Sequence, residues 1–256
     1  MFLRTILIAT TFLAATPLAY GRSFNSCDVE SAFDLTLHPN RLELTREDAS
    51  PKRVEFVDGR LWLDNREQRL SAEDRARVLR FEAEVRALAP RVRTVALEGV
   101  AIAVDAIGLV ITHLGGDSAK LDALRLELTQ HARDWERRIR SAHSTRDWGK
   151  EGDAAFAAKL VAQMAPAIAG EMAASAVRAA LSGDEVKLKA IEARAEGLEK
   201  EIERRIEARA DRLEVAAKAL CPSIRELDRI DNALAIRTAG NRRLNLVEID
   251  RENQDN

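Results

Sequence analysis

The chain has 256 residues, a formal net charge of −2, 32% charged residues and 4% aromatic residues. This near balance of acidic and basic side chains argues against a nucleic-acid partner, which would need an excess of Lys and Arg on one face. Hydrophobic residues make up 46% of the chain, which is enough to bury a core. The richness in Ala, Glu and Arg is typical of helical proteins.

Residues 1–21 are predicted to be a signal peptide and not part of the fold. Arg4 gives a positively charged start, and residues 6–18 form an apolar stretch that is too short to span a bilayer stably. Residues 19–21, Ala-Tyr-Gly, form a small-x-small cleavage signal, so we expect cleavage after Gly21. The alternative is an uncleaved membrane anchor.

The two cysteines, Cys27 and Cys221, both follow the expected cleavage site. An even number of cysteines in an exported chain predicts a disulfide bond, which here would link positions 194 residues apart (221 − 27). The alternative is a pair of unbonded, buried thiols. No C-x-x-C spacing is present, so a redox-active pair is not expected.

Residues 22–70 have the pattern of a small β-sheet. Apolar and polar residues alternate at 33–37 and at 42–44, which places the apolar ones on one face of each strand. Residues 47–52 are polar and indicate a loop, and residues 66–70 are a candidate edge strand.

The strongest local signal is a β-hairpin centred on the Asp-Gly pair at 58–59. This pair favours the two-residue type I′ turn. Pairing outward from the turn sets Phe56 opposite Leu61 and Val54 opposite Leu63, all on one face. We expect that face to pack on a helix, because a hairpin alone is marginally stable.

A long helical run begins after Ser71, which is predicted to cap it. Pro90 should kink or break the helix. Residues 95–114 are almost uncharged, with only Glu98 and Asp105 as acids, and allow two interpretations. A central helix of a soluble bundle is favoured over a membrane span, because both acids would be costly at membrane depth.

More helices follow, an Ala-rich one at 153–181 and the most regular one at 184–220. The latter has a coiled-coil seam with one stutter between Ile202 and Ala210. At about 1.5 Å per residue it forms a rod of roughly 54 Å, so we expect an elongated body. An antiparallel partner within the chain is the simpler use of the seam; the alternative is oligomerisation, and the oligomeric state is left open.

The predicted fold class is α+β, mostly α. A small N-terminal antiparallel sheet at 22–70 packs on a bundle of long antiparallel helices at 71–221, with Cys221 and Pro222 ending the last rod. Residues 222–256 form a tail with a possible strand at 242–250, all within one mature domain. A disulfide would bring that tail beside the N-terminal sheet, where it could pair; the alternative is a loosely held terminus.

Several motifs occur in a familiar order. Cys27 lies near the mature start, Asp-Gly-Arg-Leu at 58–61 follows, Leu-Ser at 70–71 enters the helix, and Pro90 and Ala-Leu-Glu-Gly-Val at 96–100 come after it. This layout resembles the YggN-like family of exported proteobacterial proteins, a domain of unknown function. The resemblance implies a periplasmic location and carries over no catalytic residue.

No motif for chemistry emerges from the sequence. His38, His113, His131 and His143 lack metal-site spacing, so neither a metal nor a cofactor is expected. The favoured function is that of a non-enzymatic periplasmic envelope or interaction protein with an envelope protein as its partner, no nucleic acid, and peripheral or no membrane contact. The alternative is a hydrolase or lipid-handling protein with a groove between the sheet and helix 95–114.

Overall fold

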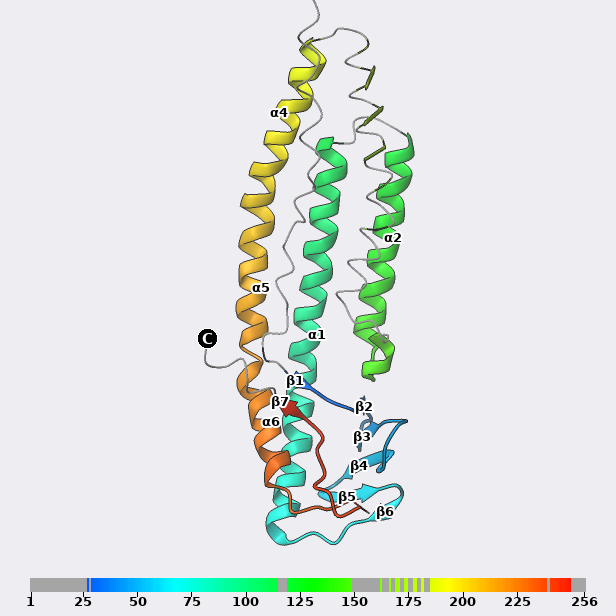
Figure 1. Cartoon of the computed structure of the whole chain (residues 1–256), viewed down its shortest axis with the longest axis vertical. Coiled ribbons are helices and arrows are strands. Elements are labelled where there is room, and N and C mark those ends of the chain that lie inside the picture. Colours follow the sequence, from blue (N-terminus) through cyan, green and yellow to red (C-terminus); the bar gives the residue numbers. More distant parts are fainter. Residues whose placement is uncertain are drawn as a thin grey trace, which may run out of the picture.

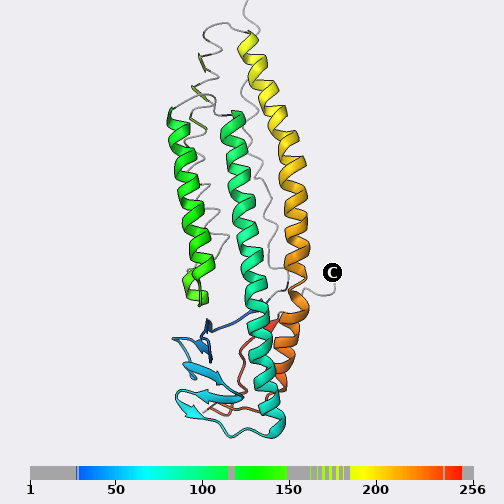
Figure 2. The same cartoon turned by 180° about the vertical axis from the view of Figure 1, so that it is seen from behind.

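The computed structural model describes residues 27, 29–114, 119–148, 185–238 and 240–249, with single positions between 162 and 181. As predicted, it is an α+β structure that is mostly helical. The small sheet lies at one end of an elongated helical body (Figures 1 and 2). The predicted signal peptide and, apart from the single positions, the predicted helix at 153–181 lie outside the described residues.

The strands are β1 (Val29–Glu30), β2 (Asp34–Leu37), β3 (Leu42–Thr45), β4 (Arg53–Val57), β5 (Arg60–Leu63), β6 (Arg66–Glu67) and β7 (Glu248–Ile249). The helices are α1 (Ala72–Leu114), α2 (Ala119–Ser141), α4 (Glu185–Glu201), α5 (Ala208–Lys218) and α6 (Cys221–Ala233). A short 3-10 turn, η1 (Thr145–Trp148), follows α2, and a π-helical segment, η2 (Ile202–Glu207), joins α4 to α5.

Strands β2 to β6 form a five-stranded antiparallel sheet in which each strand pairs with the next one along the chain. The predicted hairpin register is confirmed: Phe56 pairs with Leu61, and Val54 pairs with Leu63. The Asp-Gly turn has the expected positive φ angles of 50° and 75°. The candidate edge strand is also present as β6, although it covers only two residues.

The sheet packs its apolar face against α1, as expected. Phe56 of β4 stacks on Phe81 of α1 with 5.0 Å between the ring centroids, and both side chains are buried. The opposite face of the hairpin, with Glu55 and Trp62, is only half-buried. One compact core therefore joins the sheet to the first turns of α1.

Helix α1 does not end at Pro90, so of the two outcomes predicted there, a kink or a break, the break is wrong. The helix starts as predicted, with the Ser71 hydroxyl accepting a hydrogen bond from the Asp74 N–H at 3.0 Å. It then runs through the proline without interruption. Pro90 is exposed, so water can solvate the carbonyl that the proline leaves without a donor.

Part of the seam predicted along residues 184–220 packs inside the molecule, with Leu198, Leu213 and Ala217 buried. The stutter predicted within 202–210 falls where η2 widens the helix into π-helical geometry. An extra residue per turn lets the apolar face stay in register with its neighbour after the irregular spacing.

That neighbour is α1 of the same molecule. Where Gly99 of α1 lacks a side chain, the position of a Cβ atom would be 3.8 Å from Leu213 of α5. Arg209 of α5 donates hydrogen bonds to Glu98 at 3.0 and 2.9 Å and another to Asp105. The hydrogen bonds to Glu98 raise the pKa of Arg209. The two acids of the apolar half of α1 thus share one arginine from the antiparallel helix.

By length and composition, α1 is the one helix in the described part of the chain that could cross a membrane. Only 22% of its most apolar stretch is buried in the structure. From the sequence, residues 95–114 are expected to be the central helix of a bundle. The described residues alone do not bury this helix to that extent.

We expect Arg209→Met to lower the free energy of unfolding by about 1–2 kcal/mol, because two carboxylates on α1 lose their shared partner. Glu98 and Asp105 are 45% and 43% exposed, so solvent screens both and keeps the loss below that of a buried pair. Urea unfolding measures the change. Arg204→Met is the matched control, since Arg204 is 71% exposed and pairs within its own helical segment. A loss no larger than that of the control would contradict the assignment.

Helix α5 ends at Lys218, so the rod does end close to Cys221 and Pro222 as predicted, but the segment after them is not only a tail. Helix α6 begins there and continues beside α1 toward the sheet (Figure 1). A proline in the first helical turn removes no hydrogen bond, because those N–H groups have no partner in the helix. Leu227 and Ile230 of α6 are buried and extend the core that covers the sheet.

The strand predicted at 242–250 is shorter than expected. Within the described residues 242–249, β7 is the only strand of more than one residue, and it pairs with β1 through Val29 and Ile249 in a two-stranded sheet separate from the larger one. The tail therefore does pair with the N-terminal strand, and it is not loosely held at 244–249. Leu244, Leu246 and Ile249 are buried.

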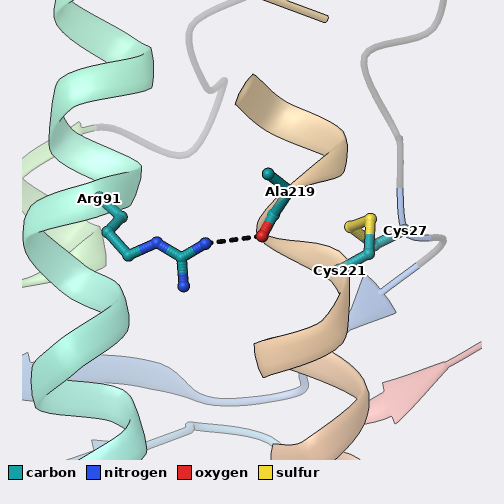
Figure 3. The surroundings of a disulfide bond; sticks show 4 residues. All are labelled: Cys27, Arg91, Ala219 and Cys221. Carbon is teal, nitrogen blue, oxygen red and sulfur yellow. Dashed lines mark hydrogen bonds between the residues drawn. A yellow bond between two sulfur atoms is a disulfide. The ribbon is translucent and has the colours of Figure 1, made fainter. Parts of the chain in front are cut away.

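The predicted disulfide joins Cys27 to Cys221, with 5.3 Å between their Cα atoms (Figure 3). It fixes Cys27, two positions before β1, to the first residue of α6. Beside it, Arg91 of α1 donates a hydrogen bond to the Ala219 carbonyl at 2.6 Å. The N-terminal strand, the last helices and α1 are thereby held together at one place.

Candidate functional site

An apolar cavity of about 350 Å³ lies between the sheet and α1. The sheet wall consists of large apolar side chains from β2, β3 and the residue before β2: Phe33, Leu35, Leu37 and Leu44. The α1 wall presents apolar side chains from successive turns: Phe81, Val85, Leu88, Ala89 and Val92. Helix α6 and the C-terminal segment add the apolar side chains of Ile224, Leu227, Leu246 and Val247 to the lining.

The two main walls follow from the periodicities of the sequence. Alternation with a period of two turns Leu35 and Leu37 to the same side of β2. Helical spacing turns Phe81, Val85 and Val92 to the same side of α1. The cavity therefore lies where a strand face and a helix face meet.

The sequence places a groove between the sheet and residues 95–114, and this location is wrong. The cavity lies against residues 81–93, in the earlier half of α1. The sheet contacts only the first turns of α1, while the later half extends away from it beside α2 and α4 (Figure 1).

One side of the cavity is closed by residues 142–145, which follow α2. The Leu37 N–H donates to the His143 carbonyl at 2.7 Å, and the Leu35 N–H donates to the Thr145 hydroxyl at 3.0 Å. These bonds cover the open edge of β2, which would otherwise present unpaired backbone groups.

Another side is closed by residues 244–249, which we call the tail strap. The Ser31 hydroxyl donates to the Leu246 carbonyl at 2.7 Å. Asp231 of α6 accepts hydrogen bonds from the N–H groups of Leu246 at 2.7 Å and Val247 at 3.3 Å. The strap is thus held by a side chain from each of two distant parts of the chain.

Asp231 is fully buried, with 0% of its surface exposed. Burial raises its pKa to about 6, because desolvation penalises the carboxylate more than the two backbone N–H donors favour it. Its second oxygen, Oδ1, is buried and has no hydrogen-bond partner among the described residues. Asp231 is therefore a buried acid beneath the tail strap, and its ionisation is unfavourable.

Two arginines of α1 hold the ends of neighbouring helices. Arg91 binds the end of α5 at Ala219, and Arg93 donates to the carbonyls of Ile139 at 3.2 Å and Ala142 at 3.0 Å, at the end of α2. A cation at a helix C-terminus is favourable because the carbonyls there carry partial negative charge. Only Arg93 of the two also lines the cavity.

The histidines lie on different elements. His38 follows β2 with its Nε2 3.3 Å from Glu43, His113 lies in the last turn of α1, His131 is on α2, and His143 lines the cavity. Among the described residues, no group of three or more His, Cys, Asp or Glu side chains could hold a metal ion.

Sequence reasoning does not find Arg93, Asp231 or Ser31 as parts of a site. Asp231 has a usable signal, since it lies four residues after Leu227 and so on the apolar face of α6. An acid on an apolar helix face indicates a buried hydrogen-bonding role. Arg93 has no such signal, because arginines are frequent throughout the helices.

The fold and the cavity define a mostly helical α+β protein with an apolar site between a small sheet and a long helix. Residues 27–247 match the family described as "Protein of unknown function (DUF2884)", and the chain belongs to that family. This match covers most of the chain and supports the coarser part of the resemblance, a domain of unknown function. A search of curated proteins gives no match, and neither does a search of solved structures.

Proposed function

We propose that this protein is an exported binding protein of the cell envelope that holds an apolar chain in the cavity between the sheet and α1. The apolar lining of the cavity is the observation that carries the proposal. Export is supported by the signal-like residues 1–21 and by the Cys27–Cys221 disulfide, since disulfides persist in oxidising compartments.

The size of the cavity suits such a ligand. Small-molecule sites in proteins have volumes of about 300–1,000 Å³ and mostly apolar walls. A dry cavity of about 150 Å³ takes up benzene, so a cavity of about 350 Å³ has room for a chain of roughly a dozen carbon atoms. No constellation for covalent chemistry is found among the described residues that line it, which favours binding over hydrolysis.

Filling the cavity tests the proposal. Ala89→Trp puts a large side chain into the wall, and we expect it to lower the affinity for dodecanoate or dodecanol by at least about tenfold. Ala87→Trp is the matched control, because Ala87 is exposed on the same helix and does not line the cavity. Calorimetric titration measures binding, and circular dichroism checks that both variants fold.

Two results would contradict the proposal. One is that the unmodified protein binds neither amphiphile, and the other is that Ala89→Trp and Ala87→Trp bind equally well. Native mass spectrometry of protein purified from the envelope of its own cells adds an independent measurement, since a bound apolar molecule should be retained.

A second candidate function is docking of an envelope protein on the helical body, as the sequence favours. The exposure of large apolar side chains away from the sheet supports it: Leu126 on α2, Val186 on α4 and Val215 on α5 are 61%, 77% and 68% exposed. Crosslinking in cells from cysteines placed at these positions tests it. Recovery of no specific partner from any of the three would count against docking.

A further inference from the structure

We infer that the apolar chain carries an anionic head group, and that Arg93 binds this group at the end of the cavity formed by residues 142–145. This inference rests on the proposed function, since it names the class of ligand that the same cavity takes. It comes from the position of Arg93, its hydrogen bonds and its lack of a carboxylate partner.

Arg93 lies at the boundary between the apolar wall and a polar end of the cavity. Both Arg93 and Ala142 line the cavity, and the guanidinium donates to the Ala142 carbonyl at 3.0 Å. The positive charge therefore lies beside residues 142–145. Here His143, Ser144 and Thr145 provide polar groups, whereas the α1 wall before Arg93 is apolar.

The charge of Arg93 is only partly compensated. An arginine is protonated at every physiological pH. Its Nε and Nη2 atoms donate to carbonyls at the end of α2, and the structure gives Nη1 no partner among the residues that it describes. No described carboxylate pairs with Arg93, although many other arginines of the chain have such a partner. A half-buried guanidinium with a free N–H donor is suited to bind an anionic head group.

The lining also contains one acidic side chain, which disfavours an anionic head group close to it. Glu30 of β1 lines the cavity, is exposed and makes no ion pair with Arg93. Glu30 would repel an anion placed close to it, and a cationic head group would instead be attracted to Glu30. The two possibilities give opposite orders of affinity.

Four amphiphiles with the same chain and different heads distinguish these possibilities: dodecanoate, dodecyl phosphate, dodecanol and dodecyltrimethylammonium. Each is titrated calorimetrically below its micelle-forming concentration. We expect both anions to bind about tenfold or more tightly than dodecanol, because a charge-assisted hydrogen bond is added to the same apolar contacts. The order of the two anions shows whether a fatty acid or a phosphate-bearing lipid fits better.

Arg93→Gln should bring the affinities for dodecanoate and dodecanol to within about twofold of each other, with dodecanol binding unchanged. Arg91→Gln is the matched control: Arg91 holds the end of α5 in the same way but lies outside the cavity lining. It should keep the preference for anions. If Arg93→Gln does not fold, the four titrations of the unmodified protein still test whether the cavity prefers an anionic head group.

The remaining outcomes overturn one proposal or both. Equal affinity for all four amphiphiles, or an equal preference for anions in both arginine variants, would overturn the role of Arg93 and leave the apolar cavity as a binding site. Tighter binding of the ammonium amphiphile would also overturn it, in favour of Glu30. Binding of none of the four would overturn both the head-group inference and the proposed function.

Discussion

Replacing Cys27 and Cys221 by serine is expected to lower the free energy of unfolding by roughly 5 kcal/mol, the largest effect that we predict for any change. The disulfide closes a loop of 194 residues, and a cross-link stabilises the folded state more when the loop that it removes from the unfolded chain is longer. Such a loss is a large fraction of the total stability of an ordinary domain.

The structure around the disulfide gives a second reason to expect a large loss of stability in the double serine variant. Strand β1 has only two residues and pairs only with β7, so without the disulfide little holds it in place. The tail strap would lose its partner strand, and the cavity would open on that side. We therefore expect the double variant to lose ligand affinity as well as stability.

Urea unfolding of the unmodified protein, with and without a reductant, and of the double serine variant measures this effect. The reduced protein and the variant should unfold at the same, lower urea concentration. Ser31→Ala serves as a smaller control, since it removes one hydrogen bond to the tail strap and should cost about 1 kcal/mol. Free thiols in the purified protein, or an unchanged midpoint after reduction, would contradict the prediction.

The sequence is sufficient to predict the hairpin of the sheet, because the signals that specify it are local. Asp-Gly at 58–59 selects the turn, and the period-two alternation then fixes which of Val54, Phe56, Leu61 and Leu63 face the core. The Ser71 cap is local in the same way. Each of these features depends on interactions between residues close together in the chain.

The features that the sequence does not reveal depend on tertiary packing. The continuity of α1 through Pro90 is consistent with the exposure of Pro90 and with the contacts of Arg91 and Arg93 on two neighbouring helices. Helix α6 is missed because Pro222 resembles a terminator, although proline is also a good first residue for a helix.

The sequence predicts an apolar groove between the sheet and a long helix, but it does not predict the position of that groove along the helix. Apolar faces on a strand and on a long helix imply a contact between them. Which part of the 43-residue α1 the sheet covers depends on how β1, α6 and the tail strap pack together. These segments are brought together by the Cys27–Cys221 disulfide, which the sequence predicts, and by the hydrogen bonds of Asp231 to Leu246 and Val247, which it does not predict.

The second large effect is a dependence of stability on pH that comes from Asp231. Its pKa is about 6 in the folded protein against an ordinary value of 3.8, so the folded state binds this proton more tightly than the unfolded state. Its contribution to stability is therefore fully present below pH 3.8 and is lost as the pH rises through about 6. The difference between the two pKa values corresponds to about 3 kcal/mol.

Asp231→Asn removes this titration while keeping an oxygen that can accept from the N–H groups of Leu246 and Val247. Between pH 4 and pH 7.5, the unmodified protein should lose up to about 3 kcal/mol more stability than the variant does. Urea unfolding at several pH values measures this difference. The whole protein changes its charge over this pH range. The contribution of Asp231 is therefore taken as the difference in the free energy of unfolding between the unmodified protein and the variant.

Asp122→Asn is the matched control, because Asp122 lies on α2 and is 72% exposed. Its stability profile should follow that of the unmodified protein at every pH. Parallel profiles for Asp231→Asn and the unmodified protein would show that Asp231 does not titrate in this range. If the difference appears as expected, ionisation of Asp231 lowers the stability of the folded protein at neutral pH, because burial of the carboxylate costs more than its hydrogen bonds to Leu246 and Val247 return.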